Sequence, residues 1–347
     1  MNRLKAGILG ATGIVGQQYL RMLKNHPNFE VTGLFASSLS KGKNLKESAG
    51  FKLTDDVEEF GDMSIEKADE EILQRDDIDL IFSALPSNMG GLEETLSKKF
   101  PLITKSSSHR LDSDVPLIIP EVNPEHLTLI NEQRKHGKAG FISADPNCST
   151  TQLAIPLKAL EPFGISQVIV STMQALSGAG YPGVSSLDAS GNVTPYIEGE
   201  EQKIKSESVK ILGTLNAEGH LMLSGMCIEA KCARIPVPDG HMENVFIKFK
   251  SRPDIEDVRN ALRNFRGTKK VQKLWSSPEL PIILIDAPDR PQHRLDLMKG
   301  DGMSVVVGNV KMSGEFLTFT SLSHNIIRGA AGGGIQHAEL LHSEGYL

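Results

Sequence analysis

The feature that most constrains the fold is a glycine-rich turn at the start of the chain, between a short apolar segment and a helical pattern. Residues 4–9 are predicted to form a buried strand, Gly10, Gly13 and Gly16 follow it, and a helix is predicted over about residues 17–26. Glycines let backbone N–H groups approach a pyrophosphate, and a helix N-terminus favours its charge. The G-x-x-G-x-x-G spacing is weak evidence alone, but the strand–turn–helix context favours a dinucleotide site over a merely structural turn.

The end of the second predicted strand bears on the choice of dinucleotide. Residues 30–36 form this strand, Ser37 and Ser38 follow it, and Lys41 and Lys43 come soon after. An NAD-binding fold usually places Asp or Glu here to bond the ribose hydroxyl. An acid would repel the 2′-phosphate of NADP, whereas hydroxyls and lysines would bind it, so the sequence favours NADP. The alternative is that the lysines belong to an ordinary solvated loop.

Two further predicted strands, residues 79–85 and 101–104, end in polar residues. Open α/β sheets bind ligands at the carboxyl ends of their strands, so Ser83 and Leu85 are predicted to border the nicotinamide. The second strand runs into the segment Ser106-Ser-Ser-His-Arg110. This segment is a plausible anion site, and an ordinary polar loop is an equally good interpretation.

The remaining segments of this half indicate one domain with a parallel sheet. Residues 50–75 are polar with weak periodicity, residues 116–120 lie between prolines and are an edge strand or a connection, and residues 124–136 are a predicted helix. Strands that alternate with helices are typical of a Rossmann-like fold. We predict an NADP-binding domain over residues 1–147.

The stretch Ser143-Ala-Asp-Pro-Asn-Cys-Ser-Thr-Thr-Gln152 carries the first candidate nucleophile. An extended segment gives way here to a helical pattern, and Asp145-Pro146-Asn147 is a turn signal. Cys148 would therefore lie at or just before a helix N-terminus, where free N–H groups and the helix dipole stabilise a thiolate. A buried, inert cysteine is the alternative. Pro156 predicts a kink or a short first segment in this helix.

After Cys148 the pattern changes from alternating strands and helices to a majority of strands. Strands are predicted at residues 167–176, 221–232, 244–249, 281–286, 303–308 and 316–322, and helices up to residue 212 and at residues 255–265. This pattern predicts an α+β domain with a mixed sheet over residues 148–324, one face of which could carry a dimer contact. A terminal helix within residues 325–347 is predicted to pack back on the first domain.

The segment Arg234-Ile-Pro-Val-Pro-Asp-Gly-His241 is the second informative stretch. Two prolines and a glycine after a strand predict a shaped loop. A histidine could take the thiol proton and return it to a leaving group, and Arg234 could hold a carboxylate by a bidentate pair. A lone loop histidine is as often a surface residue, but a helix-start cysteine together with His241 and Arg234 suits nucleophilic catalysis.

Glu200 and Lys203 share one face of a predicted helix. A surface ion pair is the simpler interpretation, and the alternative is that Glu200 meets a substrate ammonium and Lys203 an anion. Cys227 and Cys232 are five residues apart in a strand, so they face opposite ways and form neither a metal pair nor a disulfide. His337 and His342 also lack metal spacing, and no metal site is predicted.

The composition limits the possible partners. The net charge of −6 argues against a nucleic-acid or anionic-membrane surface, and no apolar run is long enough to span a membrane. The first residues run straight into a strand, so no signal peptide is expected. Three cysteines in 347 residues indicate free thiols and a reducing cytoplasm.

Six motifs occur together and in order, and as a set they are specific. They are Gly10-Ala-Thr-Gly-Ile-Val-Gly16, Asp145-Pro-Asn-Cys-Ser149, Gln174-Ala-Leu-Ser-Gly-Ala-Gly180, Gly199-Glu-Glu-Gln-Lys203, Arg234…Gly240-His241 and Asn325…Arg328-Gly-Ala-Ala-Gly332. The chain resembles the aspartate-semialdehyde dehydrogenase family over nearly its whole length, in the archaeal and fungal branch rather than the common bacterial one.

The resemblance implies a role for each candidate residue. Cys148 is the nucleophile, His241 the acid/base, and Gln174 orients the substrate beside the thiol, with Asn147 also at the substrate. Arg234 would bind the substrate carboxylate, Glu200 its ammonium, and Lys203 and Arg110 the phosphate. The NADP site would be lined by Gly10, Thr12, Gly13, Ile14, Val15, Ser37, Ser38, Ser83, Leu85, Ser177, Gly178 and Asn325.

The implied reaction is the reversible, phosphate-dependent oxidation of L-aspartate 4-semialdehyde to L-4-aspartyl phosphate with NADP, through a Cys148 thioester. The family runs it in reverse, toward threonine, methionine and lysine, in a cytoplasmic homodimer or homotetramer. A malonyl-CoA reductase is the main rival, although it has no use for Glu200 or Lys203, and N-acetyl-glutamyl-phosphate reductase is a more distant one. A non-catalytic NADP-binding redox sensor would use Cys148 only as an oxidisable thiol and would require neither His241 nor Arg234.

Overall fold

The computed structural model describes residues 3–49, 55–135 and 137–347 and divides the chain into two compact units. The first comprises Met1–Ile118, Pro124–Pro146 and Ala330–Leu347, and the second comprises Ile119–Asn123 and Asn147–Gly329. The sequence predicted that residues 1–147 form the first domain and that the C-terminal segment from about residue 325 packs back on it. The short segment Ile119–Asn123 belongs to the second unit, where a buried ion pair joins Glu121 to Arg328.

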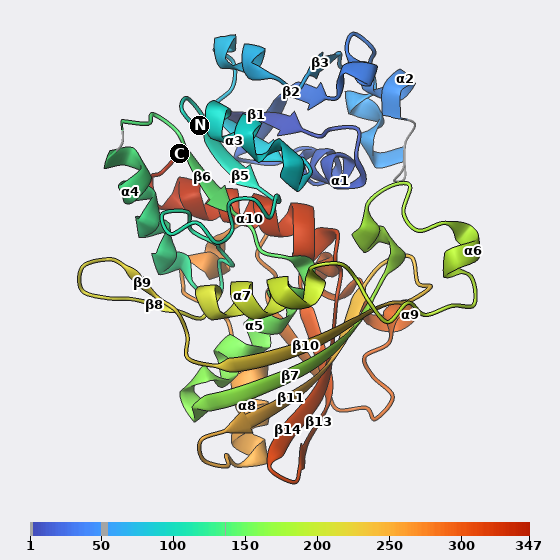
Figure 1. Cartoon of the computed structure of the whole chain (residues 1–347), viewed down its shortest axis with the longest axis vertical. Helices are drawn as coiled ribbons and strands as arrows, with labels where there is room; N and C mark the ends of the chain where they lie inside the picture. The colour runs from blue at the N-terminus through green and yellow to red at the C-terminus, as the bar shows by residue number, and fades with distance from the viewer. Residues whose placement is uncertain (1–2, 50–54, 136) are drawn as a thin grey trace. The chain divides into compact units, whose positions relative to one another are not determined.

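The first unit contains a six-stranded parallel sheet, as predicted for a Rossmann-like domain. The strand order is β3-β2-β1-β4-β5-β6 (Figure 1). The strands are β1 (Leu4–Leu9), β2 (Phe29–Ala36), β3 (Ile65–Lys67), β4 (Leu80–Ser83), β5 (Pro101–Thr104) and β6 (Phe141–Ala144). The helices are α1 (Ile14–Leu23), α2 (Leu45–Ala49), α3 (Gly90–Leu96), α4 (Ile130–Lys135) and α10 (Gly332–Ser343). Strand order reverses between β1 and β4, which is where such sheets bind ligands.

The helix bounds of this unit differ from the predicted ones in two places. Helix α1 begins at Ile14 rather than near residue 17, because Gly13 already takes the N-cap position. The helix predicted over residues 124–136 starts with a 3₁₀ turn at Pro124–Leu129, and only Ile130–Lys135 is α-helical, while residue 136 lies outside the described residues. In the proline-flanked segment 116–120, a single bridge pairs Leu117 with Ala144.

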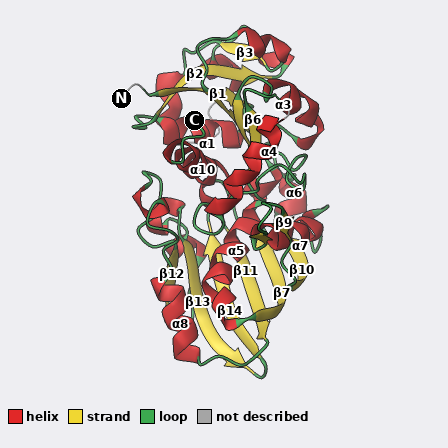
Figure 2. Ribbon diagram, turned by 90° about the vertical axis from the view of Figure 1, so that its left-hand side faces the viewer, coloured by secondary structure: helices red, strands yellow, loops and turns green. Residues whose placement is uncertain are grey.

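The second unit contains a six-stranded mixed sheet, which confirms the predicted fold class. Its order is β10-β7-β11-β14-β13-β12, and Figure 2 shows the strands side by side. They are β7 (Ile165–Gln174), β10 (Cys227–Arg234), β11 (His241–Phe249), β12 (Ile282–Ile285), β13 (Val305–Ser313) and β14 (Phe316–Ser323), with a separate hairpin of β8 (Thr214–Leu215) and β9 (Leu221–Met222). The helices are α5 (Cys148–Leu160), α6 (Ser186–Ala189), α7 (Glu200–Ile211), α8 (Ile255–Asn264) and α9 (His293–Asp296).

Side chains alternate between the two faces of the mixed sheet, and one of these faces is buried. Buried and exposed residues alternate along most of β10, and the interior of the unit is completed by α5, α7 and α8, which pack on the sheet. The alternation leaves Cys227 exposed and Cys232 buried, so their predicted opposite orientations are confirmed. The single strand predicted over residues 221–232 was wrong, because β9 pairs only with β8 and the sheet strand starts at Cys227.

Helix α5 runs without a break through Pro156, so the predicted short first segment was wrong. Eleven of its thirteen residues are buried, which makes tertiary packing the source of its stability. That packing outweighs the backbone hydrogen bond that Pro156 cannot make.

In the described part of the chain, no helix is long and apolar enough to cross a membrane.

Candidate active site

Cys148 is the first residue of α5, and Asn147 is the N-cap. The Asn147 side-chain oxygen accepts hydrogen bonds from the backbone N–H groups of Ser149 at 2.9 Å and Thr150 at 3.2 Å. The capping residue is thus Asn147, directly before the cysteine. The thiol lies in the first helical turn, where the helix dipole stabilises a thiolate.

His241 lies beside the thiol, with its Nε2 atom 3.1 Å from Cys148 Sγ. It is the first residue of β11 rather than part of a loop, because the turn ends at Gly240, whose φ of +91° suits glycine. The His241 ring is only 1% exposed, and its Nδ1 accepts the backbone N–H of Ala175 at 3.1 Å. Burial, followed by the positive charge of Arg234, lowers the pKa of His241 to about 3, so the ring is neutral.

Arg234 and Gln174 are the last residues of two paired strands, β10 and β7, and lie opposite each other in the register. The Nη1 atom of Arg234 donates to the carbonyl oxygen of Ala175 at 2.6 Å. Gln174 is buried and its amide donates to the Thr172 hydroxyl at 3.2 Å. Burial lowers the pKa of Arg234, whereas Glu200 raises it. The parallel pairing of β7 and β10 therefore places both predicted substrate residues at one end of the sheet.

Two glycines leave the space around the thiol open. A Cβ atom on Gly178 would lie 2.7 Å from Arg234 Nη1 and 3.1 Å from His241 Cε1. A Cβ atom on Gly329 would lie 2.5 Å from the Cβ atom of Cys148. Gly329 belongs to a π-helical turn at Ile327–Ala331, a form that is frequent at functional sites. Any larger residue at either position would collide with a predicted catalytic group.

Glu200 is buried, so the interpretation of a surface ion pair was wrong for this residue. Its Oε1 atom accepts the Asn147 side-chain amide at 2.6 Å, and its Oε2 atom lies 3.5 Å from Lys203 Nζ. Lys203 remains more than one-third exposed. The carboxylate is thus held next to the residue that precedes the nucleophile.

Glu207 is a residue of this site that sequence reasoning missed. It is 2% exposed, and its Oε2 atom accepts the backbone N–H of Asn147 at 2.7 Å. Glu200 and Glu207 are seven residues apart on α7, so the helical repeat places both on the face that packs against α5. That seven-residue spacing from Glu200 was the available signal. Together the two carboxylates hold both nitrogens of Asn147.

Removing the Glu207 carboxylate is expected to destabilise the turn at Asn147, directly before Cys148. Glu207→Ala leaves the buried N–H of Asn147 without this acceptor, which costs about 1–3 kcal/mol of unfolding free energy. Glu207→Gln keeps an oxygen acceptor and is expected to lose less in both stability and kcat. Urea unfolding and steady-state kinetics test both variants.

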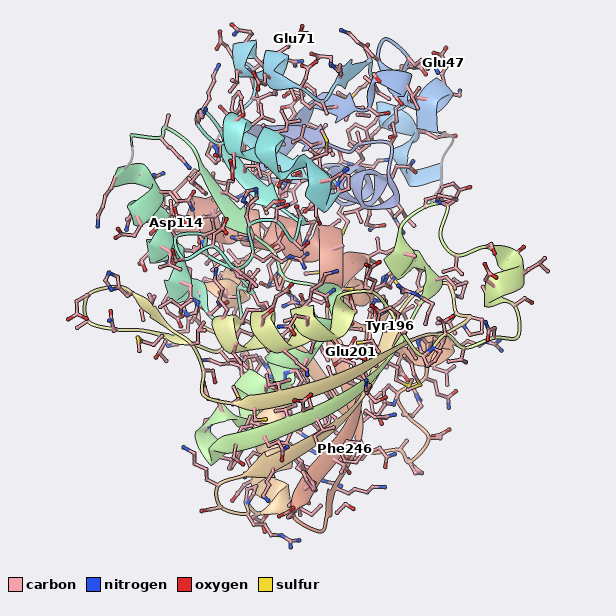
Figure 3. All side chains as sticks on the ribbon, viewed as in Figure 1. Glu47, Glu71, Asp114, Tyr196, Glu201 and Phe246 are labelled. Atoms are coloured by element: carbon pink, nitrogen blue, oxygen red, sulfur yellow. The ribbon has the colours of Figure 1, made fainter. Side chains whose placement is uncertain are left out.

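Glu201→Ala is the matched control for this prediction. Glu201 is on the same helix (labelled in Figure 3), and its side chain is 27% exposed and pairs with Lys231 at 3.4 Å. Its removal is expected to leave kcat unchanged. Equal losses for Glu201→Ala and Glu207→Ala would contradict a specific role for Glu207.

The structure also joins Ser177 to Asn325, two predicted cofactor residues from distant parts of the chain. The Asn325 amide donates to the Ser177 hydroxyl at 2.9 Å, and its oxygen accepts the Gly240 N–H at 2.8 Å. Gly240 precedes His241, so Asn325 links the turn after β7 to the turn before β11. Gly178, which follows Ser177 directly in the sequence, is exposed.

In the first unit, the glycine turn has the geometry of a dinucleotide cradle. Gly10 has a φ of +78°, and a Cβ atom on Gly16 would lie 2.2 Å from the Gly10 carbonyl oxygen. The backbone N–H groups of Ile14 and Val15 are in the first turn of α1, where a helix supplies no acceptor. Thr12, with its side chain partly exposed, precedes Gly13 at the N-cap. These features fit a bound pyrophosphate.

Ser37 and Ser38 are exposed immediately after β2, as the NADP prediction requires. Leu85, after β4, is partly exposed, but Ser83 is completely buried and its hydroxyl donates to Glu93 Oε1 at 2.5 Å. The side chain of Ser83 is therefore occupied inside the unit, and its carbonyl oxygen accepts the backbone N–H of Lys105 at 3.0 Å.

Arg110 is 7% exposed rather than a free surface cation, and its Nη2 atom donates to the Lys105 carbonyl oxygen at 2.6 Å. The serines before it form a network: the Ser106 and Ser108 hydroxyls are 2.7 Å apart, and Ser108 also donates to the Ser87 carbonyl at 2.7 Å. This network ties the segment after β5 to the segment after β4.

In the described ranges, no group of three potential metal ligands occurs.

Two family profiles match most of the chain. The profile described as semialdehyde dehydrogenase, NAD binding domain, matches residues 5–130. The profile described as semialdehyde dehydrogenase, dimerisation domain, matches residues 156–328. The two matches fall on the two halves that the sequence had assigned to cofactor binding and to catalysis.

Relatives with known names cover nearly the whole chain. An aspartate-semialdehyde dehydrogenase from Methanothermobacter thermautotrophicus is 43% identical, covering 98% of this chain and 99% of the relative. A malonyl CoA reductase (NADP) from Metallosphaera sedula is 41% identical, covering 99% of this chain and 98% of that protein. The crystal structure of aspartate semialdehyde dehydrogenase with NADP from Candida albicans has a TM-score of 0.90 at 39% identity, covering 99% of this chain and 100% of that one.

Proposed function

Because this chain belongs to the aspartate-semialdehyde dehydrogenase family, we propose that it catalyses the NADP-dependent, phosphorylating oxidation of L-aspartate 4-semialdehyde and its reverse. The observation that carries the proposal is the contact of 3.1 Å between Cys148 Sγ, at the start of α5, and His241 Nε2, with Arg234 at the end of β10. A thiol, a polar partner and a fixed cation are the parts that acyl-transfer chemistry requires.

Cys148 is the proposed nucleophile. Its thiolate attacks the aldehyde carbon and forms a thiohemiacetal, and loss of hydride leaves a thioester on Sγ. When bound, NADP⁺ supplies the hydride acceptor. Phosphate then attacks the thioester, releases the Cys148 thiolate and gives L-4-aspartyl phosphate. Backbone N–H groups at the start of α5 are suitable donors to the oxygen on which negative charge develops.

Two protein side chains of opposite charge are proposed to bind the two charged groups of the substrate. Arg234 would bind the α-carboxylate as a bidentate pair, and Glu200, oriented by Asn147, would bind the α-ammonium. Gln174, opposite Arg234 in the register, would orient the substrate beside the thiol. Lys203, whose side chain is partly exposed, is the proposed phosphate ligand in the second unit. Arg110, in the first unit, remains a predicted phosphate ligand.

The proposed cofactor is NADP. The glycine turn and the first turn of α1 would hold the pyrophosphate through Gly10, Thr12, Gly13, Ile14 and Val15. Ser37 and Ser38 would bind the 2′-phosphate, since no acid stands at the end of β2. Ser83, Leu85, Ser177, Gly178 and Asn325 remain predicted neighbours of the cofactor.

A homodimer or homotetramer in the cytoplasm is the proposed assembly. Ile169 and Phe246 lie opposite each other on β7 and β11 and are 39% and 41% exposed, so the sheet carries apolar residues on its open face. Apolar pairs of this kind are suited to burial against a second copy. The profile matched by this half of the chain is that of a dimerisation domain.

A comparison of substrates separates this proposal from malonyl-CoA reduction, which one close relative's name supports. We expect NADPH formation beyond one equivalent per active site only when phosphate is present, because without phosphate the acyl group stays on Cys148. We also expect Glu200→Gln to raise the KM for the semialdehyde about tenfold or more, since a charged hydrogen bond is lost. Parallel assays with NAD⁺ and with malonyl-CoA complete the comparison. Reduction of malonyl-CoA that is faster than semialdehyde turnover and insensitive to Glu200→Gln would favour the alternative.

A further inference from the structure

A second row of polar side chains crosses the buried face of the mixed sheet, behind the active site. It lies two residues along the strands from Arg234, Gln174 and His241, the spacing at which side chains of a strand share a face. The register aligns its members across four adjacent strands: Cys232 on β10, Thr172 on β7, Glu243 on β11 and Ser321 on β14. All four are buried, and Glu243 is completely buried. This row therefore contains a carboxyl group that neither the proposed reaction nor the proposed substrate binding uses.

The contacts of Glu243 leave two buried oxygen atoms without a donor. The side-chain amide of Gln152 donates to the Ser321 hydroxyl at 2.9 Å, and this hydroxyl donates to Glu243 Oε2 at 3.4 Å. The Oε1 atoms of Gln152 and Glu243 are buried and have no hydrogen-bond partner among the described residues. An amide oxygen can only accept, whereas a protonated carboxyl group has one O–H to donate. Because the two side chains meet at Ser321, a proton on Glu243 Oε1 satisfies both oxygens with one hydrogen bond.

No cation holds Glu243 as a carboxylate. Within the described ranges its side chain forms no ion pair, and its neighbours across the strands, Thr172 and Ser321, are neutral. Burial raises the pKa of Glu243 well above its usual range, whereas the Ser321 hydroxyl lowers it. An unpaired carboxylate costs far more to bury than a neutral acid that is hydrogen-bonded. The surroundings of Glu243 therefore favour the protonated form.

We propose that Glu243 is a positioning residue for Cys148: it stays a neutral carboxylic acid, and its Oε1–H donates to Gln152 Oε1 and holds the first turns of α5 against the sheet. Gln152 follows Cys148 by four residues on α5, so both side chains lie on one face of the helix. Their contacts with Ser321 and His241 show that this face meets the sheet. The hydrogen bond is thus one helical turn from the thiol. The inference goes beyond the proposed function and rests on it only for the reaction that Cys148 performs.

Infrared difference spectroscopy of the full-length protein tests the protonation state directly. The spectrum of Glu243→Gln is subtracted from that of the native protein at neutral pH. We expect the carbonyl band of a protonated carboxylic acid, shifted when the protein is labelled with ¹³C-glutamate and absent from the variant. A carboxylate band in its place would overturn the proposal. This readout does not depend on turnover, so it stands even if the semialdehyde proves not to be the substrate.

Thermal unfolding gives a second test of the neutral acid. The titratable groups near Glu243 are Cys232 and Arg234 on β10, His241 on β11, and Cys148 and Lys158 on α5, whereas β7 and β14 carry none. All of these are shared by the native protein and Glu243→Gln. A raised pKa in the folded state lowers native stability as the pH rises above about 4, the usual pKa of glutamate. We therefore expect the Tm of Glu243→Gln, relative to native, to increase from low to neutral pH, and a difference independent of pH would contradict the proposal.

Steady-state kinetics test the positioning role. Glu243→Gln keeps a donor and an acceptor, so its kcat is expected to stay within about threefold of native, whereas Glu243→Leu has neither. The leucine variant is expected to lower kcat about 10- to 10²-fold with a nearly unchanged KM, because a small displacement of a reacting group slows the chemical step. The control is Thr320→Val, next to Ser321 on the other face, whose hydroxyl donates to Asn244 at 2.9 Å. This variant is expected to keep native kcat.

Gln152→Leu tests whether Glu243 acts through Gln152. Since one hydrogen bond is lost in either variant, we expect Gln152→Leu to lower kcat as much as Glu243→Leu, and the double variant no further. Losses that multiply in the double variant would contradict a shared bond. A glutamine variant at Glu243 that is folded by circular dichroism but as impaired as Glu243→Leu would overturn the proposal.

Discussion

Cys148→Ala is expected to lower kcat for semialdehyde oxidation by about four orders of magnitude or more, because removal of a covalent nucleophile leaves only binding and electrostatic effects. NADP⁺ affinity is expected to stay at the level of the native protein, since Cys148 is in α5 and the glycine turn is in the first unit. Steady-state kinetics and fluorescence titration of NADPH give the two readouts. Mass spectrometry of the native protein mixed with semialdehyde and NADP⁺ without phosphate should trap the acyl group on Cys148.

The chain offers a matched control for the nucleophile. Cys227 is exposed on β10, and Cys227→Ser is expected to keep native turnover. Cys232 is buried, and burial raises the pKa of its thiol to about 11, so it is inert toward alkylation at neutral pH. Normal turnover by Cys148→Ala, or acyl label on Cys227, would rule out the assigned nucleophile.

Arg234→Leu is expected to lower kcat/KM for the semialdehyde about 10²- to 10³-fold, because a fixed, nearly buried cation meets the substrate carboxylate. Arg234→Lys keeps the charge but loses the planar pair of donors, so it is expected to fall between the native protein and the leucine variant. The loss should appear mainly in KM for the lysine variant. The leucine variant also leaves the Ala175 carbonyl without its donor, so its kcat should fall as well.

Arg263→Leu controls for loss of an arginine as such. Arg263 is half-exposed on α8 and lies 3.5 Å from Asp286, a surface contact worth about 0–1 kcal/mol. Its kcat/KM is expected to stay within about twofold of native. An Arg234→Leu variant that kept native kcat/KM would contradict the carboxylate role and would favour the redox-sensor alternative.

Much of the fold was readable in the sequence because local patterns and local structure agree. The apolar run before Gly10 became β1, and the segment 101–104 became β5 with the predicted bounds. The strand-rich half after Cys148 became a mixed sheet. The predictions were less accurate where packing decides, as at Pro156, where burial of α5 outweighs the lost backbone bond.

The sequence by itself determined the residue types of the site and their order along the chain. The cysteine at a helix start, the histidine and the arginine followed from local chemistry, and the ordered motifs indicated the family. Only the tertiary structure decided how these groups meet. The pairing of β7 with β10 and β11 brings Arg234 and His241 to Ala175, and the packing of α7 on α5 brings Glu200 and Glu207 to Asn147. Such contacts join residues far apart in the chain, and a hydrogen bond from a single backbone amide, such as that of Ala175 to His241, leaves no mark in the sequence.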